Sequence, residues 1–199
     1  LMASGIGDGI GITKRDAAAV TSFDYTLFRN NTAATSFNEI IYFKGITQVL
    51  GGALYKATNL VIEELNNPLL SKIGYGAFNS TKVRKITRLA EQVTIDSEAM
   101  DLGGAFENCT ELTEITQEAS RCLVTIGGSA FRSSGLQGTI DLSSAITISG
   151  MAFRETQISR IIIGENCETI GGGAFFKCVN AEVEDLNLPK LKNLSYGAF

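Results

Sequence analysis

A short motif repeats at regular intervals in this sequence, and the repeat limits the possible folds more than any other feature. The motif is an alanine followed by a large apolar residue, with a branched apolar residue four places before the alanine, as in Ile73…Ala77-Phe78. Successive copies are 22 to 28 residues apart. A unit of that length cannot bury its own apolar face, so it stacks on its neighbours as one coil of a solenoid. The alanines of the motif are Ala53, Ala77, Ala105, Ala130, Ala152, Ala174 and Ala198.

Each unit also contains two short stretches rich in β-branched residues, which predict strands. One precedes the motif, as in Val93–Ile95 and Cys167–Ile170, and the other follows it, as in Leu136–Leu142 and Ile158–Ile163. Strands of neighbouring coils lie about 4.8 Å apart, so six steps give a sheet face about 29 Å long. We expect the phenylalanines of the motif to form a ladder inside the coils. The predicted fold is α+β and β-rich: a right-handed solenoid over residues 46–199 with about seven motif copies.

The longest step, of 28 residues, ends at Ala105 and contains an insertion. Ile95…Ala99-Met100, inside the insertion, is a second version of the motif. The sequence leaves open whether this version or Ala105-Phe106 occupies the coil position. The chain ends at Phe199, directly after a motif, so we expect the last coil to be unfinished.

Residues 1–45 do not repeat, and we interpret them as a leader and a helical cap. Thr13…Asp16 and Ser36…Glu39 both resemble N-terminal capping boxes, which predicts two short helices over the end of the first coil. We expect apolar side chains of this segment to cover the sheet edge, which would otherwise pair with other strands. These side chains are Leu27, Phe28, Phe37, Ile41 and Phe43.

Composition narrows the function. The chain has no histidine, which removes the usual general base and most catalytic zinc sites. Its net charge is −4 and it has no long basic run, so we expect no nucleic-acid partner. No apolar stretch approaches the roughly 20 residues that span a bilayer. We therefore expect no cofactor, no bound metal, no membrane span and no enzymatic activity.

The four cysteines are expected to be free. Cys109 and Cys178 occupy the same repeat position three coils apart, about 14 Å at the strand spacing, which is too far for a disulfide. Cys122 and Cys167 also lie in different coils. We interpret them as buried thiols, although a reactive thiol at Cys122 or Cys167 stays possible.

The motif resembles that of the BspA-like (Treponema pallidum type) leucine-rich repeats. The closest copies are Ile170-Gly-Gly-Gly-Ala-Phe-Phe-Lys-Cys178 and Ala105-Phe-Glu-Asn-Cys-Thr-Glu-Leu-Thr-Glu-Ile115. The resemblance covers residues 46–199. It implies a bacterial protein at the cell surface or secreted, with a role in adhesion and protein–protein contact. The opening residues lack the basic start and apolar segment of a signal peptide, which leaves localisation open on the residues alone.

Charged residues follow the motif in successive coils, and their sign alternates along the solenoid. One explanation is pairing between neighbouring coils on a solvated face, and the other is a charge pattern that selects a partner. A pair of carboxylates for glycoside hydrolysis is excluded, because the acidic clusters lie about 14 Å apart, farther than such chemistry uses. The candidate partner-binding face consists of Arg84, Lys85, Glu111, Glu114, Gln137, Arg160, Glu182 and Glu184.

The leading functional hypothesis is a non-enzymatic binding or adhesion module that presents an extended sheet face to a protein or glycan partner. The alternative is a structural spacer within a longer surface or virion-associated protein. An exposed aromatic or apolar patch would favour binding, whereas a uniformly polar surface would favour the spacer.

Overall fold

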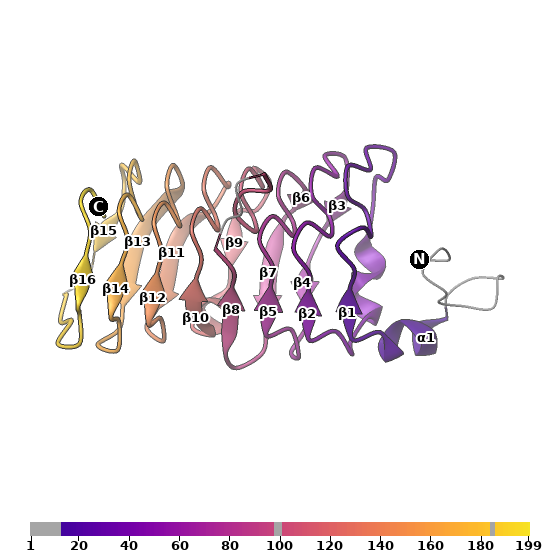
Figure 1. Cartoon of the computed structure of the whole chain (residues 1–199), viewed down its shortest axis with the longest axis horizontal. Coiled ribbons are helices and arrows are strands. Elements are labelled where there is room, and N and C mark those ends of the chain that lie inside the picture. The colour runs from indigo at the N-terminus through magenta and orange to yellow at the C-terminus, as the bar shows by residue number, and fades with distance from the viewer. Residues whose placement is uncertain (1–12, 98–100, 184–185) are drawn as a thin grey trace.

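The chain forms a row of stacked coils, which confirms the predicted solenoid (Figure 1). The structure is a computed structural model that describes residues 13–97, 101–183 and 186–199. Each coil contributes one strand to a parallel eight-stranded sheet that runs the length of the row. In spatial order its strands are β1 (Ser22–Phe23), β2 (Gln48–Val49), β5 (Lys72–Ile73), β8 (Val93–Ile95), β10 (Leu123–Ile126), β12 (Thr147–Ile148), β14 (Thr169–Ile170) and β16 (Asn193–Leu194).

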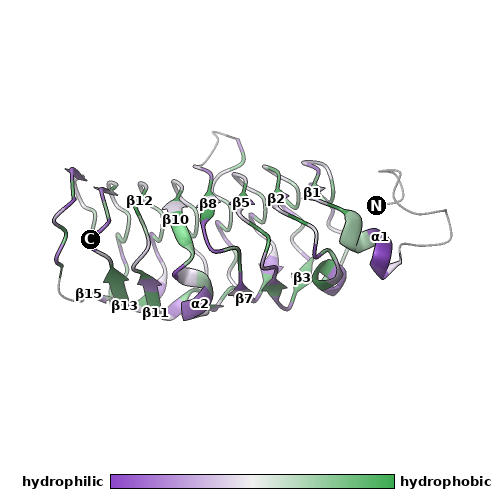
Figure 2. Ribbon diagram, turned by 90° about the horizontal axis from the view of Figure 1, so that it is seen from below, coloured by the Kyte–Doolittle hydropathy of each residue, from purple (hydrophilic) through white to green (hydrophobic). Residues whose placement is uncertain are grey.

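The opposite side of the solenoid carries shorter parallel sheets and one helical turn (Figure 2). The helical turn, α2 (Gln117–Ser120), lies between the sheets. Thr116 caps it, because its side chain accepts a hydrogen bond from the amide of Ala119. The strands are β3 (Val61–Ile62) with β6 (Lys82–Val83), then β4 (Leu65–Asn66), β7 (Lys85–Arg88) and β9 (Glu114–Ile115), then β11 (Gln137–Leu142), β13 (Gln157–Ile163) and β15 (Glu182–Val183).

The register of the eight-stranded sheet explains the sequence pattern of each coil. Ile73 lies opposite Val49 and Ile95, and the same column continues through every later strand. The residue before it points outward, as Gln48 and Lys72 do. One inward and one outward residue per short strand is the period of two that a half-buried sheet requires.

A ladder of phenylalanine rings fills the interior of the coils, as predicted. Consecutive rings lie 4.9 to 5.5 Å apart between centroids and within 10° of parallel. Phe106 stacks on both of its neighbours, so Ala105-Phe106 occupies the coil position. Ala99 and Met100 lie outside the described residues. The rings belong to Phe78, Phe106, Phe131, Phe153, Phe175 and Phe199.

The coils begin earlier than residue 46. Phe23 in β1 pairs with Val49, and the amide of Phe28 donates to Ala53 O at 2.8 Å, the same bond that Phe78 makes to Ala105. Leu27-Phe28 therefore stands where later coils have Ala-Phe. This copy departs from the motif at two places, because leucine replaces the alanine and Phe23 replaces the branched residue.

The helical cap is smaller than predicted. Thr13 and Asp16 form the predicted capping box at the start of α1 (Lys14–Ala19). The second box, at Ser36, is wrong: η2 (Asn38–Tyr42) is a 3-10 helix that begins after Phe37 and has no side-chain cap. The cause is backbone pairing with the next coil, because Ser36 forms a β-bridge with Val61 and the amide of Phe37 donates to Val61 O.

An aromatic cluster closes the first coil. Phe23 contacts the rings of Phe37 and Phe43 at 5.6 and 5.1 Å. Phe37 and Phe43 are buried as predicted, but Ile41 is 41% exposed and Ile40 is buried in its place. The reason is that a 3-10 helix has three residues per turn, which rotates Ile41 outward relative to an α-helix.

Replacing Phe131 with alanine tests the ring ladder. Phe131 is fully buried between Phe106 and Phe153, so we expect Phe131→Ala to lower the free energy of unfolding by about 3–5 kcal/mol. Phe176, which is 41% exposed and outside the ladder, is the control, and Phe176→Ala should cost about 1 kcal/mol or less. Urea unfolding of the variants measures both values. Similar costs for the two would contradict a core built on the ladder.

Candidate functional site

Seven of the residues selected from the sequence lie in the described part of the chain, along the side of the solenoid opposite the eight-stranded sheet, and we call this surface the charged wall. Its residues lie on or near β6, β7, β9, β11, β13 and β15. Backbone hydrogen bonds connect its coils, from the amide of Arg84 to Ile62 O, from that of Thr113 to Arg84 O, and from that of Gln137 to Thr113 O. Arg84, Glu114 and Gln137 are exposed.

Charges of the wall pair from coil to coil. Nη1 of Arg84 lies 2.6 Å from Glu63 and its Nε 3.0 Å from Glu111. These hydrogen bonds, the one to Glu63 above all, raise the pKa of the Arg84 guanidinium. Lys85 lies 2.9 Å from Glu114 on the next strand. Such exposed pairs are worth about 0.2–1 kcal/mol each, so they hold the side chains in place but contribute little to stability.

Toward the C-terminus, on β11, β13 and β15, selected residues of the charged wall again lie opposite polar or charged residues of the next strand, but fewer of them are charged. Gln137 pairs with Gln157 in the register of β11 and β13, and Arg160 stands opposite Glu182 in β13 and β15. Glu184 lies outside the described residues. The structure thus brings the other seven selected residues onto one wall. Lys85 of β7 lies opposite Glu114 of β9, Arg160 of β13 lies opposite Glu182 of β15, and the neutral Gln137 of β11 separates the two pairs.

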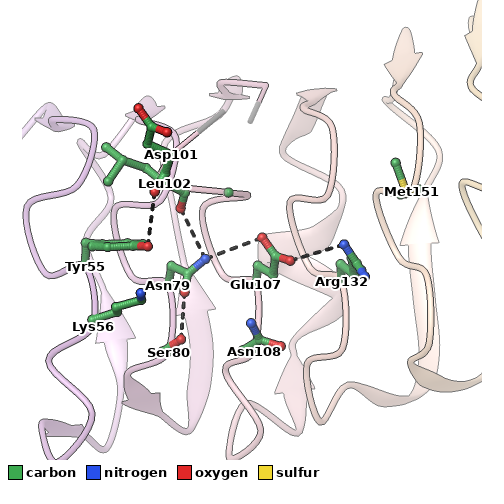
Figure 3. A pocket seen from close by; sticks show the side chains of 11 residues that line it. Tyr55, Lys56, Asn79, Ser80, Asp101, Leu102, Glu107, Asn108, Arg132 and Met151 are labelled. Atoms are coloured by element: carbon green, nitrogen blue, oxygen red, sulfur yellow. Dashed lines mark hydrogen bonds and ion pairs between the residues drawn. The ribbon is translucent and has the colours of Figure 1, made fainter. Parts of the chain in front are cut away.

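A groove on the edge of the solenoid was not selected from the sequence; we call it the rim groove (Figure 3). It has a volume of about 690 Å³ and crosses several coils at the turn that follows each motif. Its lining consists of Tyr55, Lys56, Asn79, Ser80, Asp101, Leu102, Gly103, Glu107, Asn108, Arg132 and Met151.

The insertion of the fourth coil forms one side of the rim groove. Tyr55 donates its hydroxyl hydrogen to Asp101 O at 3.1 Å, and the buried Asn79 donates to Leu102 O at 3.2 Å (Figure 3). Glu107 accepts from the amide of Gly104 at 2.9 Å and pairs with Arg132 at 3.5 Å. These contacts attach the insertion to the coils before and after it.

The remaining groups of the rim groove suit binding. Lys56, Ser80 and Asn108 occupy the second place after the motif, where φ lies between 53° and 60° in these coils. The Lys56 ammonium group lies 5.1 Å from the centroid of the Tyr55 ring. Together with Arg132 these side chains offer more hydrogen-bond donors than acceptors, because Glu107 is already engaged. Among the residues that the structure describes, no cluster of three or more His, Cys, Asp or Glu side chains could hold a metal ion.

The signal for the rim groove was present in the sequence as the 28-residue step. The length of this step predicts an insertion but not where the inserted residues lie. That they fold back onto Tyr55 and Asn79, in the two preceding coils, depends on contacts that spacing does not encode.

The four cysteines are free, as predicted; Cys109, Cys167 and Cys178 are buried, whereas Cys122 is only half-buried. Cys109 and Cys178 donate through Sγ to the carbonyls of Phe78 and Phe153 at 3.0 and 3.1 Å. Thr81 and Thr156 occupy the same repeat position and donate to the same carbonyls. At these four places a small buried hydroxyl or thiol donates to the carbonyl of a ring residue. Ser134 occupies the same repeat position, but its buried hydroxyl has no hydrogen-bond partner among the described residues.

Two glycines test how the insertion is attached. Gly76 has a φ of +57°, and a Cβ added there would lie 2.4 Å from Leu102 O. Gly138 has a φ of +75°, and a Cβ added there would have no atom within 4 Å. We expect Gly138→Ala to cost about 1 kcal/mol through backbone strain alone. Gly76→Ala should cost about 2–4 kcal/mol, because strain and collision add. Thermal unfolding compares them, and equal costs would mean that Leu102 does not pack against Gly76.

Alkylation tests the thiols. Burial raises the pKa of Cys109 to about 12, and it raises the pKa of Cys178 as well. Cys122 is only half-buried, and its pKa is raised by partial burial and by the nearby Glu118. In the native protein, iodoacetamide at mildly alkaline pH should modify Cys122 first, and all four only after unfolding. Peptide mass spectrometry gives the order, and early modification of Cys109 would be incompatible with its buried hydrogen bond.

Comparison with known families identifies the repeat. The family model described as BspA type Leucine rich repeat region (6 copies) matches residues 18–102 and 91–199. The chain belongs to the BspA-type leucine-rich-repeat family. This confirms the resemblance seen in the motif, and the match includes the early coil at Phe23. No curated protein and no solved structure matches the chain.

Membership in the BspA-type family indicates a repeat module of the kind that makes protein contacts. A stack of coils of this type offers extended surfaces on which a partner can lie across several repeats. Within the described part of the chain, no helix has the length and apolarity needed to cross a membrane.

Proposed function

We propose that this BspA-type protein is a non-enzymatic binding module, acting in adhesion at the surface of a bacterium or as a secreted protein. Its partner is a protein that contacts the charged wall and the adjoining rim groove. The two surfaces are close along the chain, since Ser80 in the groove precedes Arg84 in the wall by four residues.

The observation that carries the proposal is the rim groove. Coils without an insertion stack through the same backbone bonds and the same phenylalanine ladder. A spacer needs only this ladder, so an insertion held by Tyr55, Asn79 and Glu107 is unnecessary for setting distance. A groove across neighbouring coils, beside charges held in ion pairs, supports binding instead.

The charged wall can be tested without disturbing the fold. A double substitution that exchanges Lys85 and Glu114, Lys85→Glu with Glu114→Lys, keeps their ion pair but inverts the charges that a partner meets. The control is the exchange of Lys192 and Glu168, which pair at 2.8 Å beside the eight-stranded sheet. Both exchanges should leave the melting temperature nearly unchanged, because each pair is exposed.

The binding assay uses the full chain, immobilised and exposed to extracellular-matrix and bacterial surface proteins, with bound proteins identified by mass spectrometry. We expect a saturable partner whose affinity falls on the order of tenfold or more with the Lys85/Glu114 exchange. The Lys192/Glu168 exchange should leave it unchanged. Equal effects of the two exchanges, or no saturable partner, would favour the spacer.

A further inference from the structure

Comparing equivalent positions of successive coils shows which residues on the exposed surface of the eight-stranded sheet the fold requires. The residue two places after each inward-facing strand residue is glycine in four coils and serine in one. Coils with a small residue there stack as well as the others, so the aromatic side chains Tyr25 and Tyr75 are not needed for folding. The full column is Tyr25, Gly51, Tyr75, Ser97, Gly128, Gly150, Gly172 and Tyr196.

Tyr25 and Tyr75 flank a small pocket that we call the tyrosine slot. It has a volume of about 280 Å³ and shares no residue with the rim groove. The two side chains are 55% and 38% exposed. Besides the tyrosines, the lining consists of Gln48, Val49, Leu50, Gly51, Lys72, Gly74 and Asp96.

The shape of the tyrosine slot depends on Gly51. This glycine is the middle residue of the column between the two tyrosines, and the Tyr75 ring lies over it. A Cβ at Gly51 would lie 2.7 Å from Cε2 and 2.8 Å from Cζ of that ring. Only a residue without a side chain allows the ring to take this place, so the sequence Tyr-Gly-Tyr across three coils forms the slot.

Polar groups surround the rings. Gln48 and Lys72 are adjacent in the sheet register and point outward, and Lys72 pairs with Asp96 at 3.5 Å. The ion pair leaves the slot without an unpaired charge, while the side chain of Gln48 adds both a donor and an acceptor. Two aromatic rings with a neutral polar border therefore make up the slot.

We propose that the tyrosine slot binds a neutral pyranose unit of a glycan. Pyranose rings present C–H groups on their faces, which pack on aromatic rings, and hydroxyl groups at their edges, which need donors and acceptors such as Gln48, Lys72 and Asp96. A cationic ligand would need Asp96, which is engaged by Lys72, and an anionic one would need Lys72. A purely apolar ligand would leave this polar border desolvated without partners. The site is independent of the charged wall and of the protein partner proposed above.

The probes are neutral tetrasaccharides: cellotetraose, maltotetraose, laminaritetraose, mannotetraose and tetra-N-acetylchitotetraose, each at millimolar concentration with the full chain. Saturation-transfer NMR detects binding, and calorimetry measures the affinity. We expect at least one tetrasaccharide to bind. Tyr25→Ala and Tyr75→Ala should each weaken it on the order of tenfold, whereas Tyr75→Phe, which keeps the ring, should weaken it only about threefold or less.

Gly51→Ala and Tyr196→Ala sharpen the test. Gly51→Ala leaves both tyrosines in the chain but displaces the Tyr75 ring, so it should weaken binding about as much as Tyr75→Ala. Tyr196 occupies the same repeat position as Tyr75 and is 99% exposed, but its neighbouring positions are Gly172 and Gly150. Tyr196→Ala should therefore leave binding unchanged.

Each alternative outcome would overturn the proposal. No binding of any tetrasaccharide would exclude the site, and binding that survives both Tyr25→Ala and Tyr75→Ala would place the glycan elsewhere. An equal loss with Tyr196→Ala would indicate non-specific contact with exposed aromatic residues. The Lys85/Glu114 exchange should leave glycan affinity unchanged, so failure here and failure of the charged wall are distinguishable. If Gly51→Ala does not fold, the exposed-tyrosine variants still decide.

Discussion

Every coil of this protein depends on lateral stacking against the next. Two interactions with nearly the same spacing produce it: backbone hydrogen bonds between strands about 4.8 Å apart, and phenylalanine rings 4.9 to 5.5 Å apart. Because the two spacings agree, a ring can follow each strand without strain. The buried alanine beside each ring leaves room for the backbone turn. The carbonyls of Phe78 and Phe153 each accept from the threonine three places later and from a cysteine of the next coil. A single coil has none of these partners, so stability belongs to the stack.

Stacking also determines what the surfaces can do. Equivalent positions of successive coils form straight columns, so one substitution in one repeat changes one place in an otherwise regular surface. The tyrosine slot and the rim groove are both such departures, the first through Tyr25 and Tyr75 and the second through the insertion near Leu102. The charged wall, by contrast, follows similar places in successive coils, and Arg84 and Lys85 pair there with Glu111 and Glu114 of the next coil. A stacked repeat can therefore carry several separate binding surfaces on one rigid core.

Much of the fold could be predicted because the regular spacing of the motif determines which residues stack. The spacing of Ala-Phe pairs predicted the ring ladder, and the shared position of Cys109 and Cys178 predicted buried free thiols. The prediction failed where backbone pairing between coils competes with a local helix-capping sequence. Ser36 has the sequence of a helix cap, but its backbone pairs with Val61, because a coil edge next to a strand outcompetes one side-chain hydrogen bond. The motif does not predict the early coil at Phe23, because Leu27 stands in place of its alanine.

The sequence alone determined the repeat, the solenoid, the buried ladder and the wall on which the selected charges lie. These follow from periodicity, because equal spacing along the chain becomes equal position in the stack. Tertiary structure alone decided which version of the motif enters the ladder, how the insertion folds back onto Tyr55 and Asn79, and that Tyr75 lies over Gly51. Those features depend on contacts between residues about 20 to 50 positions apart at places where the repeat is broken, and a broken repeat carries no spacing rule from which the contact could be read.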